Sequence, residues 1–176
     1  SMALTPRYSP DYSKILYLSY LNGQPSIYAY DLATDRQTLI ARTGAPTLAP
    51  RWSPDGKWVL YSVAKGGTTD IYRISSAGGG TPQRLTNGPG INIGGSYSPD
   101  GSQIVFESDQ SGSQQIYVMP ADGSAEPARI SFGEGSYGTP AWSPTGDLIA
   151  FTKRNGDRFH IGVMRPDGTE EKLLTE

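Results

Sequence analysis

Short runs in which apolar and polar residues alternate recur along the whole chain, separated by clusters of Pro, Gly, Asp and Asn. Residues two apart on a strand lie on the same face of a sheet, so this alternation predicts β-strands with one face toward a core. In the clearest runs a β-branched residue is followed two positions later by an aromatic residue: Ile15 and Tyr17, Val59 and Tyr61, Ile104 and Phe106, Ile149 and Phe151. Turn residues at regular intervals between such runs are typical of an all-β protein.

Two further strands follow each of these runs. The first contains an isoleucine, which is followed by tyrosine in three copies and by Gly162 in the fourth; the isoleucines are Ile27, Ile71, Ile116 and Ile161. The second is shorter and weaker, and we place it at 38–40, 83–86, 128–131 and 172–175.

A turn tetrapeptide precedes each set of strands and sets the repeat length. It reads Ser-Pro-Asp-Gly or a near copy and begins at Ser9, Ser53, Ser98 and Ser143, so the spacings are 44, 45 and 45 residues. A large aromatic residue stands directly before each serine: Tyr8, Trp52, Tyr97 and Trp142. About 40–45 residues is what one four-stranded propeller blade needs. The pattern therefore predicts one β-propeller domain over 1–176, built from four-stranded antiparallel blades at about 3–43, 46–88, 91–133 and 136–176.

The tetrapeptide has a local chemistry that suits a hairpin. Proline presets φ for a type I turn, aspartate can accept hydrogen bonds from nearby backbone, and glycine supplies a positive φ. In the first copy Tyr12 replaces the glycine. That turn must therefore use another geometry or hold a tyrosine in an unfavourable region.

The repeating aromatic and isoleucine residues are interpreted first as packing residues. A single four-stranded sheet is marginal in water until it stacks against a neighbour. Because Trp52, Trp142, Tyr61, Phe106 and Phe151 stand at equivalent repeat positions, we expect them to be buried between blades.

Charge and composition exclude several classes of protein. The net charge is −2 with both signs interspersed, so the chain has no basic stripe of the kind that binds nucleic acid. It contains no cysteine, which excludes disulfides and thiolate chemistry. No apolar run is long enough to span a bilayer.

Catalytic and metal-binding motifs are also missing. The only histidine, His160, precedes Ile161 at the start of a strand, where we expect one ring nitrogen to be solvated or bonded to the backbone. The chain has no Gly-x-Ser-x-Gly elbow, phosphate-binding loop or His-Glu-x-x-His motif. Asp55 and Asp100 belong to turns. We therefore expect no enzymatic activity, no cofactor, no metal ligands and no catalytic residues.

The repeat resembles the TolB-type β-propeller family of the Tol-Pal system. The resemblance rests on the aromatic-Ser-Pro-Asp-Gly turn, the Ile-Tyr strand and the Asp-Gly turn, and the chain lacks the Gly-His and Trp-Asp signatures of WD40 repeats. It covers residues 4–176, and the stretches that sharpen it are 114–120, 129–133, 137–144 and 146–153.

The resemblance implies a periplasmic, non-enzymatic scaffold that binds the lipoprotein Pal and communicates with the inner-membrane Tol proteins. It also implies a six-bladed propeller preceded by an α/β domain. Only four blades are present here, and four blades from a ring of six leave two apolar blade faces open. We therefore expect either tight closure as four blades or self-association through the terminal blades, for example as a dimeric ring.

The resemblance places Pal at the propeller face where the segment entering each innermost strand is exposed. By repeat position the predicted partner-binding residues are Leu4, Thr5, Thr47, Leu48, Ala49, Ile93, Gly94, Tyr137, Gly138 and Thr139.

Two other interpretations remain open. The chain could be the propeller of a prolyl-oligopeptidase-like serine peptidase, gating access to a hydrolase domain that would have to lie outside these residues. A metal-dependent lyase on the same fold would need several histidines in the channel, and a single histidine argues against it.

Overall fold

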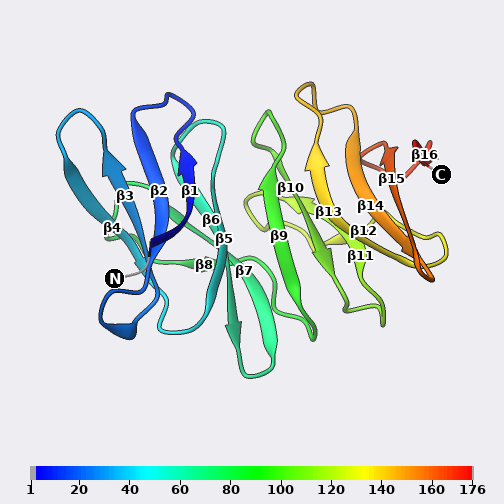
Figure 1. Ribbon diagram of the computed structural model, residues 1–176, viewed down its shortest axis with the longest axis horizontal. Coiled ribbons are helices and arrows are strands. Elements are labelled where there is room, and N and C mark those ends of the chain that lie inside the picture. Colours follow the sequence, from blue (N-terminus) through cyan, green and yellow to red (C-terminus); the bar gives the residue numbers. More distant parts are fainter. Residues whose placement is uncertain (1–2, 176) are drawn as a thin grey trace. The chain divides into compact units, whose positions relative to one another are not determined.

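The computed structural model describes residues 3–175, apart from the side chain of Asn22. The chain divides into two compact units, 1–87 and 88–176, and each unit contains two four-stranded antiparallel sheets (Figure 1). The predicted all-β fold built from four-stranded blades is confirmed. Each sheet lies within one of the four expected blade ranges, although Ser1, Met2 and Glu176 lie outside the described residues. That the four sheets together make one propeller domain over 1–176 stays a prediction.

The first unit contains strands β1 to β8. The β1–β4 sheet comprises β1 (Ala3–Tyr8), β2 (Lys14–Ser19), β3 (Ser26–Asp31) and β4 (Arg36–Arg42), with a 3-10 turn, η1 (Leu21–Gly23), between β2 and β3. The β5–β8 sheet comprises β5 (Thr47–Trp52), β6 (Trp58–Lys65), β7 (Thr68–Ser75) and β8 (Gln83–Arg84). In both sheets every strand pairs with the next one along the chain.

The second unit repeats this arrangement. The β9–β12 sheet comprises β9 (Asn92–Tyr97), β10 (Gln103–Ser108), β11 (Gln115–Pro120) and β12 (Ala128–Arg129). The β13–β16 sheet comprises β13 (Ser136–Trp142), β14 (Ile149–Asn155), β15 (Arg158–Met164) and β16 (Lys172–Leu173). The predicted fourth strands are present, and three of them, β8, β12 and β16, are only two residues long.

The core of each unit lies between its two sheets. We call the side of a sheet that carries the aromatic residue of the strand pattern, such as Tyr61 or Phe151, its first face, and the opposite side its second face. In the first unit the first face of β5–β8 packs on the second face of β1–β4; the buried residues are Val59, Tyr61 and Ile74 from the former and Leu16, Leu18, Ile27, Ala29, Ile40 and Ala41 from the latter. Burial of these rows is the main stabilising term for such stacked sheets.

The second unit has the same kind of core. The first face of β13–β16 packs on the second face of β9–β12; the buried residues are Tyr137, Ile149, Phe151 and Met164 from the former and Val105, Ile116, Val118 and Ile130 from the latter. In both units the core therefore joins an aromatic first face to an aliphatic second face.

The tryptophan before the turn motif adds a polar contact between sheets. The Trp52 Nε1–H donates to the Arg7 carbonyl oxygen at 3.2 Å, and the Trp142 Nε1–H donates to the Ser96 carbonyl oxygen at 3.2 Å. Both rings also pack against the core of their unit. The predicted packing role of the two tryptophans is confirmed.

The turn motif is held by its serine and aspartate. The Ser98 hydroxyl donates to Asp100 Oδ1 at 2.6 Å and accepts the backbone N–H of Gln103 at 3.0 Å, while the Gly101 N–H donates to the Ser98 carbonyl at 2.8 Å. The same bonds recur in the turns that begin at Ser9 and Ser53. In the fourth copy Thr145 replaces the aspartate, and Asp147 accepts from Ser143 instead.

These hydrogen bonds predict a specific acid sensitivity. Hydrogen bonds from Ser98 and Ser102 lower the pKa of Asp100 to about 2, and those from Ser9 and Ser13 lower the pKa of Asp11 to about 2. A carboxylate whose pKa is lower in the folded state contributes stability above its unfolded pKa of about 3.9, and this contribution is lost as the pH falls toward 2. For Asp100→Asn we expect a loss of unfolding free energy at pH 7 that shrinks between about pH 4 and pH 2. Urea unfolding at several pH values measures it, and a gap that does not change with pH would contradict this account.

Tyr12 occupies the left-handed region that glycine occupies in the other copies. Its φ is 60°, compared with 72° at Gly56 and 75° at Gly101. The alternative of a strained tyrosine is therefore the one found. Its ring is exposed and lies edge-on to the exposed ring of Tyr8, with centroids 6.2 Å apart.

Replacing Tyr12 should relieve this strain. We expect Tyr12→Gly to stabilise the first unit by about 0.5–1 kcal/mol, because the left-handed conformation costs most residues about 1–2 kcal/mol and glycine returns part of that gain as chain entropy. Gly101→Ala at the equivalent position is the control and should destabilise. Urea unfolding measures both, and a destabilised Tyr12→Gly variant would show that the tyrosine is not strained.

Candidate functional site

The predicted partner-binding residues lie in the first strand of each sheet, at an interruption of its pairing with the second strand. The register with the neighbouring strand shifts between Leu4 and Arg7 in β1 and between Leu48 and Arg51 in β5. It shifts in the same way between Ile93 and Ser96 in β9 and between Gly138 and Ala141 in β13. Each first strand therefore carries a β-bulge, a feature that is common next to functional sites.

One residue of each bulge has a positive φ. The four residues, each four positions before the motif serine, are Thr5 (53°), Ala49 (49°), Gly94 (72°) and Thr139 (48°). Three of them are not glycine, and each such residue stores about 1–3 kcal/mol of backbone strain. Strain repeated at one position of several repeats is an observed outlier from which a hypothesis of function can start.

Most of the predicted residues are accessible, but two are not. Leu4, Thr5, Leu48, Gly94 and Thr139 are exposed. Ala49, Ile93 and Gly138 are half-buried. Thr47 and Tyr137 are buried, and their side chains therefore support the strand instead of facing a partner.

Tyr137 shows what holds the bulge in β13. Its ring packs on Phe151 with centroids 5.3 Å apart, and its hydroxyl donates to Glu171 at 2.8 Å. Lys153 forms an ion pair with the same carboxylate at 3.0 Å. The backbone of Gly138 and Thr139 is thereby fixed to a rigid part of the second unit.

Within each unit the structure brings two bulged strands together. Strand β1 contacts β5, and strand β9 contacts β13. The exposed Leu4 and Leu48 therefore belong to neighbouring strands, as do Gly94 and Thr139. This juxtaposition supplies apolar side chains and strained backbone on adjacent strands, which suits protein docking more than bond chemistry.

Glu107 is a site residue that sequence reasoning missed. It is buried in β10, and its Oε2 accepts the backbone N–H of Thr139 at 2.7 Å, at the bulge of the neighbouring sheet. A Cβ at Gly138 would lie 2.6 Å from the same oxygen, so the carboxylate needs a glycine there. Glu107, Thr139, Thr152 and Arg154 line a cavity of about 260 Å³ beside the bulge. The available signal was a departure from the repeat, because Leu18, Ser62 and Thr152 occupy the equivalent positions.

Removing this carboxylate should loosen the β13 bulge. We expect Glu107→Ala to cost about 1–2 kcal/mol of unfolding free energy, because the Thr139 N–H loses its acceptor in a partly buried place. Glu107→Gln keeps an acceptor oxygen and is the matched control, with a smaller loss. Urea unfolding measures both, and equal losses would mean that the hydrogen bond is not what Glu107 contributes.

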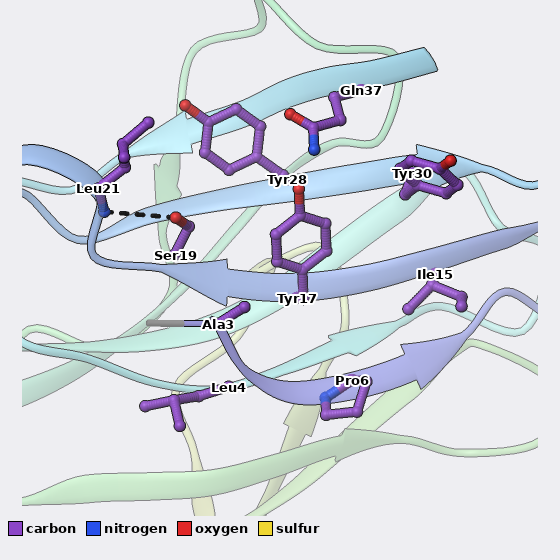
Figure 2. Close-up of a pocket in the computed structure, with 10 residues that line it drawn as sticks. All are labelled: Ala3, Leu4, Pro6, Ile15, Tyr17, Ser19, Leu21, Tyr28, Tyr30 and Gln37. Atoms are coloured by element: carbon purple, nitrogen blue, oxygen red, sulfur yellow. Dashed lines mark hydrogen bonds between the residues drawn. The ribbon is translucent and has the colours of Figure 1, made fainter. Parts of the chain in front are cut away.

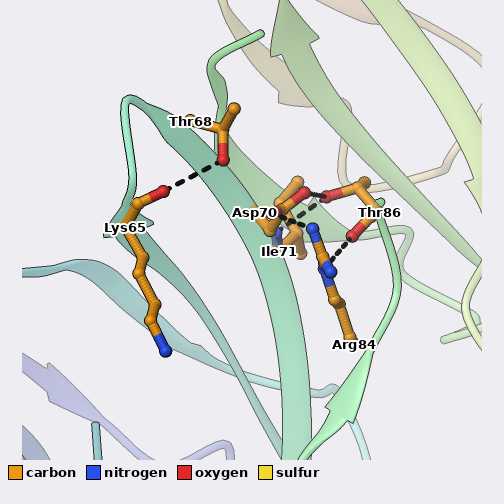
Figure 3. A network of polar contacts seen from close by, with 6 residues as sticks. All are labelled: Lys65, Thr68, Asp70, Ile71, Arg84 and Thr86. Atoms are coloured by element: carbon orange, nitrogen blue, oxygen red, sulfur yellow. Dashed lines mark hydrogen bonds and ion pairs between the residues drawn. The ribbon is translucent and has the colours of Figure 1, made fainter. Parts of the chain in front are cut away.

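A second polar cluster, at the start of β7, is structural (Figure 3). Asp70 is buried, accepts the Thr86 hydroxyl at 2.9 Å and pairs with Arg84 Nη2 at 2.6 Å. The Ile71 N–H donates to the Thr86 hydroxyl at 2.9 Å, and Arg84 Nε donates to the Thr86 carbonyl at 2.8 Å. Strand β8 pairs with β7 at only two positions, which hold it weakly. The cluster adds hydrogen bonds between the end of β8 and β7.

An equivalent polar contact explains the position of the only histidine. In the β9–β12 sheet Gln115, Ser131 and Arg129 replace Asp70, Thr86 and Arg84. In the β13–β16 sheet His160 takes the position of Asp70, and its Nδ1 lies 3.0 Å from the Thr175 carbonyl oxygen. The predicted bond of His160 to the backbone is confirmed, but His160 is the third residue of β15 and does not start the strand.

Two further kinds of feature are absent from residues 3–175. No group of three or more His, Cys, Asp or Glu side chains there is arranged to hold a metal ion. No helix among the same residues is long and apolar enough to cross a membrane.

Comparison with known proteins identifies the family that the chain matches. The family model described as the TolB beta propeller domain matches residues 1–176. The Tol-Pal system protein TolB of Gluconobacter oxydans is 45% identical over 89 residues, which are 51% of this chain and 19% of that protein. The chain thus spans about a fifth of the length of this relative.

Solved structures agree with the fold. The crystal structure of TolB from Acinetobacter baumannii matches with a TM-score of 0.83 and 32% identity, over 99% of this chain and 43% of that chain. A puromycin-hydrolyzing peptidase of Mycobacterium tuberculosis matches with a TM-score of 0.80 but only 12% identity, over 100% of this chain and 29% of that chain. At that identity the peptidase shows a shared fold and nothing about activity.

Proposed function

Because this chain belongs to the TolB beta propeller domain family, we propose that it acts as a non-enzymatic, periplasmic interaction scaffold of the Tol-Pal system. Its partners in this proposal are the lipoprotein Pal and the inner-membrane Tol proteins. Pal docks on the bulged ends of the first strands, at the mouth of the propeller channel.

The observation that carries the proposal is the repeated strained bulge. Thr5, Ala49, Gly94 and Thr139 hold a left-handed backbone inside the first strand of each of the four sheets, and the exposed Leu4 and Leu48 directly precede two of them. A bulge takes backbone groups out of the ladder, and at Thr139 the N–H donates to Glu107 Oε2 instead of to a neighbouring strand. Exposed apolar side chains beside such an interruption of the sheet are typical of a protein-binding surface.

The lack of enzymatic activity in this proposal follows from the chemistry of the same surface. A nucleophile needs an adjacent base, and the single histidine is bonded to the Thr175 carbonyl. The turn carboxylates of Asp11 and Asp100 are held in hydrogen bonds that keep them ionised. With a pKa of about 2, these two carboxylates are weak bases and are not proton donors near pH 7.

A titration tests the proposal. Purified chain is titrated with soluble Pal that lacks its lipid anchor, in an isothermal calorimeter. We expect saturable binding that Leu48→Asp weakens at least tenfold, about 1.4 kcal/mol, because an apolar contact becomes a desolvated charge.

Leu32→Asp is the matched control. Leu32 is 45% exposed and Leu48 is 44% exposed, but Leu32 follows β3, at a turn remote in sequence from every bulge. It should leave the affinity unchanged. Absence of Pal binding, or equal effects of the two substitutions, would refute the proposed docking surface.

A further inference from the structure

Glu107 is a buried carboxylate that has no cation beside it. It is 8% exposed, and its Oε2 accepts the Thr139 N–H at 2.7 Å. Among residues 3–175 no ion pair reaches this carboxylate. Glutamate is almost never buried unless it is paired, because leaving water costs a charged group several kcal/mol.

The other buried carboxylate of the described residues is paired. Asp70 forms an ion pair with Arg84 at 2.6 Å and accepts the Thr86 hydroxyl at 2.9 Å. The chain therefore neutralises one of its two buried carboxylates internally and leaves Glu107 without a counter-ion.

The cations nearest to Glu107 along β14 are held by other groups. Lys153 pairs with Glu171 at 3.0 Å. Arg154 lines the same cavity as Glu107, but its Nε donates to the Gly156 carbonyl oxygen at 3.1 Å. Neither side chain serves as the missing counter-ion.

Glu107 lies between two of the first-strand bulges. A Cβ at Gly94, in the β9 bulge, would lie 3.8 Å from Glu107 Cγ, and a Cβ at Gly138, in the β13 bulge, would lie 2.6 Å from its Oε2. Glu107 is on the second face of β9–β12, which β13–β16 covers, so it lies between two neighbouring sheets of the second unit. A protein that docks on these two bulges therefore meets this carboxylate.

The surroundings of Glu107 suit an organic cation better than a metal ion. No group of three or more His, Cys, Asp or Glu side chains within residues 3–175 could hold a metal ion, whereas a calcium ion takes six to eight oxygen ligands. A lysine or arginine side chain needs one carboxylate and brings its own hydrogen-bond donors. Hydrogen bonds of this charged kind are roughly twice as strong as neutral ones.

The cavity on the first face of the β1–β4 sheet lacks any charged group. Its volume is about 510 Å³, and the residues along the sheet that line it are Ile15, Tyr17, Tyr28 and Tyr30 (Figure 2). In the β5–β8 sheet the equivalent face, which carries Tyr61, packs on the neighbouring sheet. The first face of β1–β4 is therefore a surface for packing between blades and carries no ligand site.

We propose that Glu107 receives a lysine or arginine side chain of the protein that docks on the first-strand bulges. Glu107 thereby selects a partner that presents a cation at the point between the β9 and β13 bulges. This inference rests on the proposed function and adds the chemistry of one contact to it.

Glu107→Gln tests the contact, because it removes the charge and keeps an acceptor oxygen for the Thr139 N–H. Circular dichroism establishes that the variant is folded, and isothermal calorimetry with soluble Pal gives its affinity. We expect binding that is weaker than that of the unchanged chain by about tenfold or more, because the partner's cation is left buried without its charged acceptor.

Glu126→Gln is the matched control. It makes the same change in net charge at an exposed residue of the loop between β11 and β12, at the end of the sheet opposite the β9 bulge. It should leave the affinity for Pal unchanged. Equal losses for the two variants would mean that net charge alone sets the affinity, which would overturn the inference.

Replacing the lysines and arginines of Pal by methionine, one at a time, identifies the cation. One replacement should weaken binding to the unchanged chain about tenfold and binding to Glu107→Gln clearly less, because the two residues act as a pair. If no replacement weakens binding to the unchanged chain, the inference is overturned whether or not the Glu107 variant folds.

Leu48→Asp separates this contact from the docking itself. If Leu48→Asp weakens Pal binding and Glu107→Gln does not, the docking surface stands and the cation contact is refuted. A loss with Glu107→Gln alone supports the cation contact and refutes docking at Leu48. Absence of Pal binding to the unchanged chain would overturn both.

Discussion

Truncation of Phe151 to alanine should cost the second unit about 3–5 kcal/mol of unfolding free energy. The ring is 1% exposed and lies in the core between the β9–β12 and β13–β16 sheets. It packs at a tilt of 46° against the ring of Tyr137, whose backbone neighbours form the β13 bulge. The loss combines the apolar area returned to water with the cavity left by the ring, because sheets held by ladders collapse only partly.

Phe159→Ala is the matched control for this loss. Phe159 is on the neighbouring strand β15 and is 62% exposed, so its truncation should change stability by less than about 0.5 kcal/mol. Urea unfolding followed by circular dichroism measures both variants. Similar losses at the two positions would contradict the assignment of the core to the space between these sheets.

Adding a methyl group at Gly162 should also destabilise the second unit. The reason explains why glycine stands here, where the other three copies have tyrosine. Tyrosine follows the isoleucine in the other three copies and stacks on the aromatic ring of the preceding strand, as Tyr117 does on Phe106 at 5.7 Å. In the fourth copy a Cβ at position 162 would lie 2.4 Å from Phe151 Cζ and 3.0 Å from the Lys172 carbonyl oxygen. Glycine is therefore required, because the Phe151 ring tilts toward Tyr137 and covers the place of the missing tyrosine.

We expect Gly162→Ala to destabilise the second unit by about 1–3 kcal/mol through overpacking. The effect should depend on Phe151, and a double-mutant cycle measures this coupling. With Phe151→Ala in place, Gly162→Ala should cost clearly less than it does alone. Additive losses would mean that the backbone of β16, and not the ring, is what excludes a side chain.

Much of the fold could be predicted because the sequence contains four copies of the repeat, so that each strand position can be compared among four equivalent residues. Alternation placed the strand that holds Val59 and Tyr61, and the spacing of the motif serines fixed where each sheet begins. The bulges could not be predicted, because Thr5, Ala49 and Thr139 have no preference for positive φ. Their strain is set by the sheets around them.

The candidate site stays a prediction, and the sequence did not show how deeply each of its residues is buried. Thr47 and Tyr137 were grouped with the exposed residues, although both belong to the row that faces inward at the start of the first strand. Glu107 was not predicted as a site residue because it lies on β10, in the sheet next to the β13 bulge. A contact between two sheets does not affect the spacing of motifs along the sequence, so the sequence does not reveal it. Tertiary packing, not local pattern, decided these three residues.

The central claim is that Pal docks on the four strained bulges. Amide chemical shifts of isotope-labelled chain, recorded during a titration with unlabelled soluble Pal, test it residue by residue. We predict that the largest changes fall on Leu4, Thr5, Leu48, Ala49, Gly94 and Thr139. Changes confined to the turns around Pro54 and Pro99, or no changes at all, would contradict the claim.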